Sequence, residues 1–357
     1  MRYLGFLISG WSILLMMHWL TYSSVSSALA ISVPYSLFWL GLLAASYFIA
    51  ALLVRKKTNR FSNMLYVGAS VWLGVIVLVF SFQLPHILYQ IATGESLPLL
   101  SGGLLLLSLV VSAYAVFNAS RLVTKEYTLP IAGLAQALTI AHLTDIHIGT
   151  VHQANYLQTV VDKTNALQPD IVCITGDLFD GSVPIDESIL SSLNALSAPT
   201  FYSNGNHEEY EGLQHVRDTL GHVKGDLLEN SFVLISGLQV VGVNDKQSLP
   251  KGQTLGTILD TLQLHPELPT VLMYHTPVEW EEARARKVDL MLSGHTHNGQ
   301  IYPFTLLVRM AYKYITGLYQ VSGLFLHVSP GTGTWGPPMR LGSRNQITLL
   351  RLVTKTS

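Results

Sequence analysis

The sequence "VDLMLSGHTHNGQ", residues 288–300, joins an apolar run to two histidines that stand one residue apart beside glycines. The run over 288–292 has the length and composition of a buried strand, and the polar residues begin where that strand ends. In open α/β sheets, ligands bind beyond the carboxyl ends of the strands. We therefore interpret His295 and His297 as candidate ligand-binding residues.

Other short apolar runs along the chain are also followed by polar residues. The sequences after four of them are "TDIHIG", "GDLFD", "NGNHEE" and "HTP". Segments with helical periodicity lie between the early runs, so the pattern predicts an α/β domain whose first strands are parallel. Later runs follow one another closely, which indicates a mixed or antiparallel part. The predicted strands cover 138–143, 171–175, 200–203, 232–235, 239–243, 271–274, 288–292, 324–328 and 347–352, and the predicted helices 156–167, 187–196 and 211–220.

The polar residues at these strand ends have the chemistry of a metal site. Asp145 and His147 are two residues apart in a segment predicted to be extended, as are His295 and His297, so each pair projects from one face. The candidate ligands are Asp145, His147, Asp177, Asn206, His275, His295 and His297. Imidazole, carboxylate and amide ligands without thiolate suit Mn, Fe or Zn. Seven ligands exceed one tetrahedral zinc and fit two cations about 3.5–4 Å apart.

The five polar segments, in order, resemble the signature of the calcineurin-like metallophosphoesterase superfamily. They read "DIH", "GDLFD", "GNHE", His275 and "GHTH", and the later "GTGTWGPPMR" is similar to the membrane-associated branch of that family. The resemblance implies a four-layer α/β/β/α sandwich of mixed sheets. It also implies metal ligands, which are Asp145, His147 and His297 for one ion, Asn206, His275 and His295 for the other, and Asp177 as the bridge.

The resemblance further implies roles in hydrolysis for residues around these ligands. His207 would protonate the leaving oxygen, with Asp177 and Asn206 completing the catalytic set. Glu208 would favour the protonated form of His207, and Asp180 would orient a histidine ligand. Arg340 is interpreted either as a contact to a substrate phosphate or as a turn residue. We expect two divalent ions, with Mn²⁺ first and Fe, Zn or Mg as alternatives.

The first third of the chain has the composition of a membrane domain. The protein is 49% hydrophobic and 12% charged, whereas a typical soluble domain is about 25% charged. Apolar stretches at 4–20, 35–54, 64–82 and 98–117 each approach the ~20 residues of a membrane-crossing helix. We predict an all-α, four-helix transmembrane domain over 1–120 and a metallophosphoesterase domain over 121–357. The first stretch, followed by "ALA" at 28–30, is alternatively a cleaved signal peptide.

The basic residues of the loops predict an orientation. The loop "VRKKTNR" is strongly basic, whereas the loops on the other side of the apolar stretches carry no Lys or Arg. Basic loops stay in the cytoplasm. The sequence therefore predicts a multi-pass protein of the cell (inner) membrane with a cytoplasmic catalytic domain.

These features predict a membrane-anchored, dinuclear-metal phosphohydrolase of phosphodiesterase or pyrophosphatase type. The partners we expect are the lipid bilayer and a lipid-linked phosphoester. The net charge of −1 gives no case for nucleic acid. A phosphodiesterase of soluble nucleotides and a non-catalytic membrane sensor or scaffold remain open. The segment "TLLVRMAYKYITGLYQ", residues 305–320, predicts an amphipathic helix that either rests on the anionic membrane surface or packs on the core.

Overall fold

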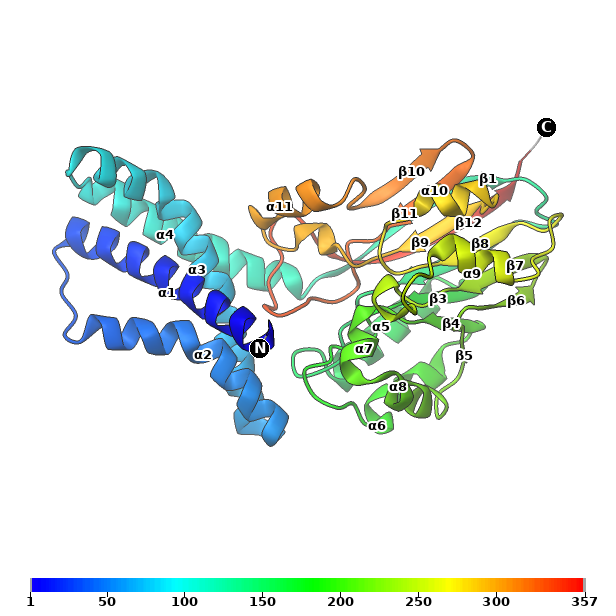
Figure 1. The fold of residues 1–357 in the computed structure, drawn as a ribbon, viewed down its shortest axis with the longest axis horizontal. Helices are drawn as coiled ribbons and strands as arrows, with labels where there is room; N and C mark the ends of the chain where they lie inside the picture. Colours follow the sequence, from blue (N-terminus) through cyan, green and yellow to red (C-terminus); the bar gives the residue numbers. More distant parts are fainter. Residues whose placement is uncertain (1, 356–357) are drawn as a thin grey trace. The chain divides into compact units, whose positions relative to one another are not determined.

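The structure, a computed structural model, describes residues 2–355 and consists of two units. A helical unit contains the described residues up to Asn118 together with Gly336–Met339. A larger unit contains Ala119–Trp335 and the chain from Arg340 onward, and it holds all the strands (Figure 1).

Four helices form the helical unit, and they are α1 (Arg2–Leu29), α2 (Ser36–Lys56), α3 (Arg60–Thr93) and α4 (Pro98–Ala119). Within the described residues, three of them, α2, α3 and α4, are long and apolar enough to cross a membrane. A membrane-like helical region is thus confirmed. The fourth crossing, predicted at 4–20, stays a prediction, although that segment lies within a helix.

Helix α3 continues well beyond its predicted end at residue 82. The side chain of Asn59 caps its start by accepting from the backbone N–H groups of Phe61 and Ser62. The polar side chain of Gln83, just past the predicted end, has a partner within the helical unit. Gln83 Nε2 donates to the carbonyl oxygen of Ser101 at 2.8 Å. Gly94 caps the end of the helix with a φ of 75°, a left-handed conformation that glycine adopts without steric strain.

The larger unit contains two six-stranded sheets. The first sheet runs in the order β1 (Leu122–Ile131), β12 (Asn345–Thr354), β2 (Leu138–Leu143), β3 (Ile171–Thr175), β4 (Thr200–Ser203) and β5 (Asp226–Leu227). The second runs in the order β10 (Gly317–Val321), β11 (Leu324–Val328), β9 (Leu290–Ser293), β8 (Thr270–Met273), β7 (Leu238–Gly242) and β6 (Ser231–Ile235).

The two sheets share one core and align their functional ends. Ile140 and Phe201 of the first sheet belong to the same buried cluster as Val271 and Leu290 of the second. Strands β2, β3 and β4 are parallel to one another, as are β7, β8, β9 and β11. Parallel strands bring their carboxyl ends to one edge, so the loops that follow them meet. The mixed α/β architecture is therefore confirmed, whereas the four-layer arrangement stays a prediction.

Short helices complete the larger unit. They are α5 (Ala154–Ala166), α6 (Glu187–Leu190), α7 (Asn206–Glu211), α8 (Leu213–Leu220), α9 (Leu255–Thr261), α10 (Trp280–Ala285) and α11 (Phe304–Ala311). The helix predicted over 211–220 begins two residues later, at Leu213 of α8, because Gly212 adopts a φ of 99° between α7 and α8.

The helix predicted over 305–320 is wrong in its second half. Helix α11 ends at Ala311, and the backbone of Tyr312 is already extended. The chain then forms β10, which pairs with β11 from Gly317 to Val321. β-Branched Ile315 and Thr316 favour extended backbone, and pairing with β11 supplies hydrogen bonds that a helix would forgo. Strands β1, β5 and β10 are not predicted from the sequence pattern.

Candidate metal centre

The seven candidate ligands all lie in segments that follow the carboxyl ends of strands. Asp145 and His147 follow β2, Asp177 follows β3, Asn206 follows β4, His275 follows β8, and His295 and His297 follow β9. Six of them are buried, and His295 is half-buried. The sheet topology therefore brings together residues that lie up to 152 positions apart in the sequence, from Asp145 to His297.

The backbone at these ligands differs from the extended form expected from the sequence. Five ligands, Asp145, His147, Asp177, His295 and His297, have positive φ angles between 48° and 67°. Non-glycine residues rarely adopt this left-handed conformation, which costs about 1–3 kcal/mol each and clusters at functional sites. The chain thus turns sharply after each strand, and this turn brings the side chains inward.

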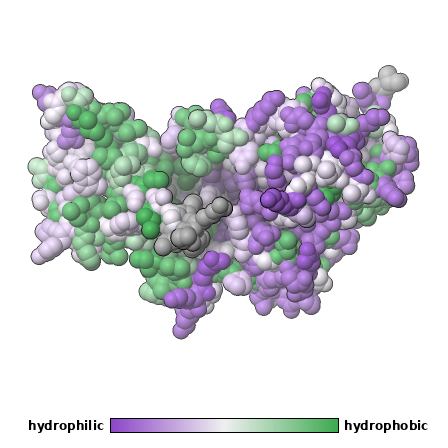
Figure 2. Space-filling model, viewed as in Figure 1, coloured by the Kyte–Doolittle hydropathy of each residue, from purple (hydrophilic) through white to green (hydrophobic). Residues whose placement is uncertain are grey.

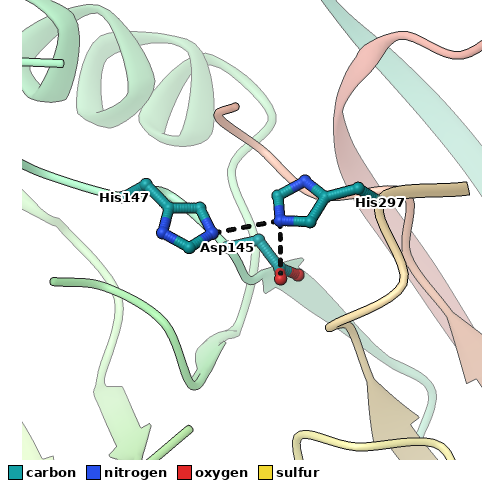
Figure 3. Close-up of side chains that lie close together, drawn as sticks. All are labelled: Asp145, His147 and His297. Carbon is teal, nitrogen blue, oxygen red and sulfur yellow. Dashed lines mark hydrogen bonds and ion pairs between the residues drawn. The ribbon is translucent and has the colours of Figure 1, made fainter. Parts of the chain in front are cut away.

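Asp145, His147 and His297 form the first cluster, with ligand atoms all within 4.8 Å of one another (Figure 3). The Nε2 atoms of His147 and His297 are 3.0 Å apart, and His297 Nε2 is 3.3 Å from Asp145 Oδ1. Two ligands bound at about 2.1 Å and at right angles to one cation lie roughly 3 Å apart. The cluster therefore matches the spacing of ligands that share one ion.

Asp177, His275 and His295 form the second cluster. His275 donates its Nδ1–H to the carbonyl oxygen of Thr175 at 2.9 Å. Its Nε2 lies 3.0 Å from Asp177 Oδ2, yet within the described chain this buried atom has no hydrogen-bond partner. A nitrogen lone pair facing a carboxylate in a buried site requires a proton or a metal cation between them.

Contacts of the second cluster extend to Asn206 and to the first cluster. His295 Nδ1 is 2.8 Å from the amide oxygen of Asn206, which places Asn206 beside the second cluster. Asp177 Oδ2 is 3.9 Å from His147 Nε2 in the first cluster as well as 3.0 Å from His275 Nε2 in the second. Asp177, a member of the second cluster, thus also faces a histidine of the first cluster.

Glu208 fixes the loops that carry Asp177 and Asn206. Its buried carboxylate accepts from the backbone N–H groups of Asp177, Phe179 and Gly205, at 2.9, 3.2 and 2.6 Å. A Cβ at Gly205 would lie 2.3 Å from Asp177 Oδ1, so only glycine fits there. Burial, followed by the Asp177 carboxylate, raises the pKa of Glu208 to about 7. Glu208 is a positioning residue for the loops, beyond the role predicted for it beside His207.

The electrostatics of the candidate ligands favour positive charge between them. Burial raises the pKa of Asp145 to about 6. Burial alone would lower the pKa of His275, but the carboxylates of Asp177 and Asp145 raise it well above its usual range. Without another cation, these carboxylates hold a proton on the imidazole. Divalent cations would satisfy the same carboxylates, so the residues present fit a metal centre.

His207 lies at the edge of the ligand clusters with one nitrogen facing them. Its Nδ1 donates to the carbonyl oxygen of Asp180 at 2.7 Å, and its Nε2 is 4.0 Å from Asp177 Oδ2. Burial works against the charged form of His207, but Asp177 and the Asp180 carbonyl raise its pKa above the ordinary value. The Asp180 carboxylate lies 3.6 Å from His147 Nδ1, close to the ligand that it is predicted to orient.

Two aromatic residues at the site were not predicted from the sequence. Tyr312 places its hydroxyl 2.9 Å from His295 Nε2. Trp335, 52% exposed, has its ring centre 6.3 Å from that of His207. Tyr312 lies in the segment predicted as helix, so its contact with His295 was not expected. The sequence offers one signal for Trp335, its place in "GTGTWGPPMR".

Arg340 has no exposed surface through which it could contact a substrate. Its side chain is fully buried and donates to Asn345 Oδ1 at 2.8 Å and to the carbonyl oxygen of His297 at 2.8 Å. It also donates to the carbonyl oxygen of Gly333. The predicted contact of Arg340 with a substrate phosphate is therefore replaced by a positioning role for the His297 loop.

The part of the chain that carries the candidate ligands is similar to known phosphoesterases. The family model of the calcineurin-like phosphoesterase matches residues 138–299. An uncharacterized metallophosphoesterase of Aquifex aeolicus is 30% identical over 261 residues, which cover 70% of this chain and 98% of that protein.

Two longer relatives match over part of their length. An uncharacterized metallophosphoesterase of Helicobacter pylori is 36% identical over 236 residues, 65% of this chain and 64% of the relative. A transmembrane protein with metallophosphoesterase domain from Bos taurus is 31% identical over 237 residues, 60% of this chain and 53% of the relative. The match to these relatives thus spans less than two thirds of their length. On the match to the Aquifex protein and the family model, this chain belongs to the calcineurin-like metallophosphoesterase family.

Proposed function

We propose that this protein is a membrane-anchored, dinuclear-metal phosphohydrolase of the phosphodiesterase or pyrophosphatase type. The observation that carries the proposal is the pair of ligand clusters, with Asp177 of the second cluster also facing a histidine of the first. In the proposed assignment Asp145, His147 and His297 hold one ion, Asn206, His275 and His295 hold the other, and Asp177 bridges. Mn²⁺ is the first expectation, with Fe, Zn and Mg as alternatives.

When bound, two divalent cations lower the pKa of a water molecule and offset the charge of the phosphate group. The protein's own residues do the rest. His207 keeps its Nδ1–H on the Asp180 carbonyl, so a protonated His207 presents its Nε2–H toward the site. From there it donates that proton to the leaving oxygen. Glu208 holds the Asp177 and Asn206 loops in place through three backbone N–H groups while the proton moves.

The proposed anchor is the helical region, with residues 1–120 as membrane domain and 121–357 as catalytic domain. Three apolar helices support membrane association. Helix α4 ends at Ala119 and β1 begins at Leu122, so only two residues, which span at most about 7 Å, separate a candidate membrane helix from the first sheet. The basic loop between α2 and α3 supports a cytoplasmic catalytic domain in the cell membrane.

We further propose a lipid-linked phosphoester or pyrophosphate as the substrate. An enzyme tethered so closely to a membrane meets lipid headgroups far more often than dilute solutes. Hydrolysis of soluble nucleotides and a role as a non-catalytic sensor are the outcomes that would replace this proposal.

The test uses full-length protein in lipid nanodiscs with Mn²⁺ or with EDTA. We expect turnover of an aryl phosphodiester with Mn²⁺, faster turnover of micellar lipid phosphates than of nucleotides, and no turnover with EDTA. Asp177→Asn should abolish turnover, whereas Asp226→Asn, on exposed β5, should keep it. Activity that survives in Asp177→Asn, or an inactive protein with every divalent metal, would contradict the proposal.

A further inference from the structure

Helix α11 exposes its large apolar side chains. Met310 is 83% exposed and Leu307 58%, with Phe304 and Leu306 about half exposed. We define these four residues as the α11 face. Figure 2 shows hydrophobic residues gathered over α11, while most of the rest of the visible surface of the larger unit is hydrophilic. The helix thus presents to its surroundings the residues that a core helix would bury.

The inward side of α11 is occupied by its one small polar residue. Thr305 is the buried residue of the helix, and its hydroxyl donates to the carbonyl oxygen of Asn298 at 3.1 Å. The backbone of Thr305 packs closely on Gly299. A Cβ atom added to Gly299 would lie 2.2 Å from the Thr305 Cα. This contact fixes the helix with its apolar residues outward. The core-packing interpretation of this segment is therefore wrong for α11.

The charges around the α11 face are basic. Arg309 on the helix and Lys313 just after it are both exposed. Residues 290–357 contain six Lys and Arg and no Asp or Glu, whereas residues 121–289 contain 21 Asp and Glu and ten Lys and Arg. Two of these six cations, Arg309 and Lys313, lie at the α11 face, and their exposed positive charge complements an anionic surface.

A lipid surface fits this face better than a protein partner does. A stable protein interface covers about 800 Å² on each side, more than one eight-residue helix presents. Aromatic and aliphatic residues beside Arg and Lys are the composition of helices that lie in the membrane interface. If α4 crosses a bilayer as proposed, the two-residue connection between α4 and β1 keeps the larger unit next to that bilayer.

We infer that the α11 face docks on an anionic lipid bilayer. This docking has a direct connection to the metal centre, because Tyr312 follows α11 and contacts His295. Trp335, beside His207, is held by Gln300, which precedes α11 in the chain: Gln300 Oε1 accepts from the backbone N–H of Trp335 at 2.9 Å, and Gln300 Nε2 donates to its carbonyl at 2.8 Å. The inference rests on the proposed function only for the presence of the membrane. It adds the face through which the larger unit meets lipid.

The experiment places a fluorescent bimane at position 310 in the full-length protein. Because Cys173 is fully buried, Met310→Cys supplies the reactive thiol. The labelled protein is incorporated into nanodiscs of phosphatidylcholine and phosphatidylglycerol that contain nitroxide-labelled lipid. The matched control is Leu234→Cys on β6, which is 50% exposed. We expect the nitroxide lipid to quench the label at 310 by about half or more, as for a side chain inserted in the interface, and to leave the label at 234 unchanged.

Two outcomes would overturn the inference. Equal quenching at 310 and 234 would show that α11 does not meet lipid. A blue-shifted label at 310 that lipid does not quench would show that protein covers the face instead. The same measurement in Asp177→Asn separates the two proposals, because docking needs no metal. In that variant we expect quenching without hydrolysis, whereas quenching without hydrolysis in the native protein would contradict the enzyme and keep the docking face.

Discussion

Buried histidines serve different purposes in the two units of the molecule. In the helical unit, His86 contacts Ser24 Oγ through Nδ1 at 2.7 Å and accepts from the backbone N–H of Leu97 through Nε2 at 3.1 Å. In the larger unit, His147 Nδ1 and His275 Nε2 have no hydrogen-bond partner within the described chain. His86, with both nitrogens bonded, connects helix α3 to Ser24 and to the backbone before α4. His275, whose unbonded Nε2 faces the Asp177 carboxylate at 3.0 Å, is placed instead to bind a cation.

The largest expected effect tests this difference directly. His275→Ala should lower turnover on the order of 10³-fold and reduce the bound metal, because it removes a ligand. His86→Ala should leave turnover within about twofold and lower the stability of the helical unit by about 1–3 kcal/mol, the cost of groups left unbonded. Turnover, metal content and thermal unfolding in detergent check both variants. Equal losses of turnover in His275→Ala and His86→Ala would contradict the difference proposed between these two histidines.

Next in size is the effect of His207, which is predicted to act without holding metal. His207→Gln should lower turnover by about 10²–10⁴-fold with the metal content unchanged. The protonated form is the active acid and its pKa is raised. Turnover by the native protein should therefore fall as the pH rises through that pKa, and the variant should lack this fall. If turnover by the variant still falls as the pH rises, a group other than His207 is responsible for that fall.

A smaller effect is expected at the α11 face. Leu307→Glu combined with Met310→Glu should slow hydrolysis of a bilayer-embedded lipid phosphate by about tenfold, because charged side chains oppose interfacial binding. Turnover of a soluble aryl phosphodiester should not change. Leu234→Glu, on the exposed part of β6, is the control. Parallel losses on both substrates would indicate damage to the site.

The smallest expected effect concerns a histidine pair that complicates the comparison. His142 and His327 are fully buried with their Nδ1 atoms 2.8 Å apart, and in the described structure neither Nε2 has a hydrogen-bond partner. The described candidate metal groups include neither residue. Replacing both by Leu should keep turnover within about twofold and leave stability equal or higher, since both partners of a buried polar pair are removed together. A large loss of turnover would assign this pair a function.

The candidate ligands could be predicted because each follows an apolar run. An apolar run indicates a strand, and parallel strands bring their following loops to one edge. The left-handed backbone at Asp145 and His147 could not be predicted, because Asp and His adopt it more often than other non-glycine residues but still only in a minority of cases. Contacts made by distant loops were equally hidden. Arg340 is buried because carbonyl groups of His297 and Gly333 surround it, and nothing near Arg340 in the sequence indicates them.

Secondary structure was predicted well where local pattern and tertiary context agree. Strands β2, β3, β4 and β11 have the predicted bounds. Helix α3 runs past its predicted end because Gln83 finds a partner in Ser101 on another helix. Strand β10 replaces predicted helix because β11 lies beside it to pair. In both cases, the deciding interaction is made with another element of the fold, α4 or β11, and not within the segment itself.

The most direct test of the account is the metal content of the full-length protein, measured by mass spectrometry after dialysis against Mn²⁺ and removal of free ions. The account predicts two divalent ions per chain, fewer than two in Asp177→Asn, and two in the control Asp226→Asn. A protein that hydrolyses phosphoesters without bound metal, or an Asp177→Asn variant that keeps both ions, would contradict the shared site.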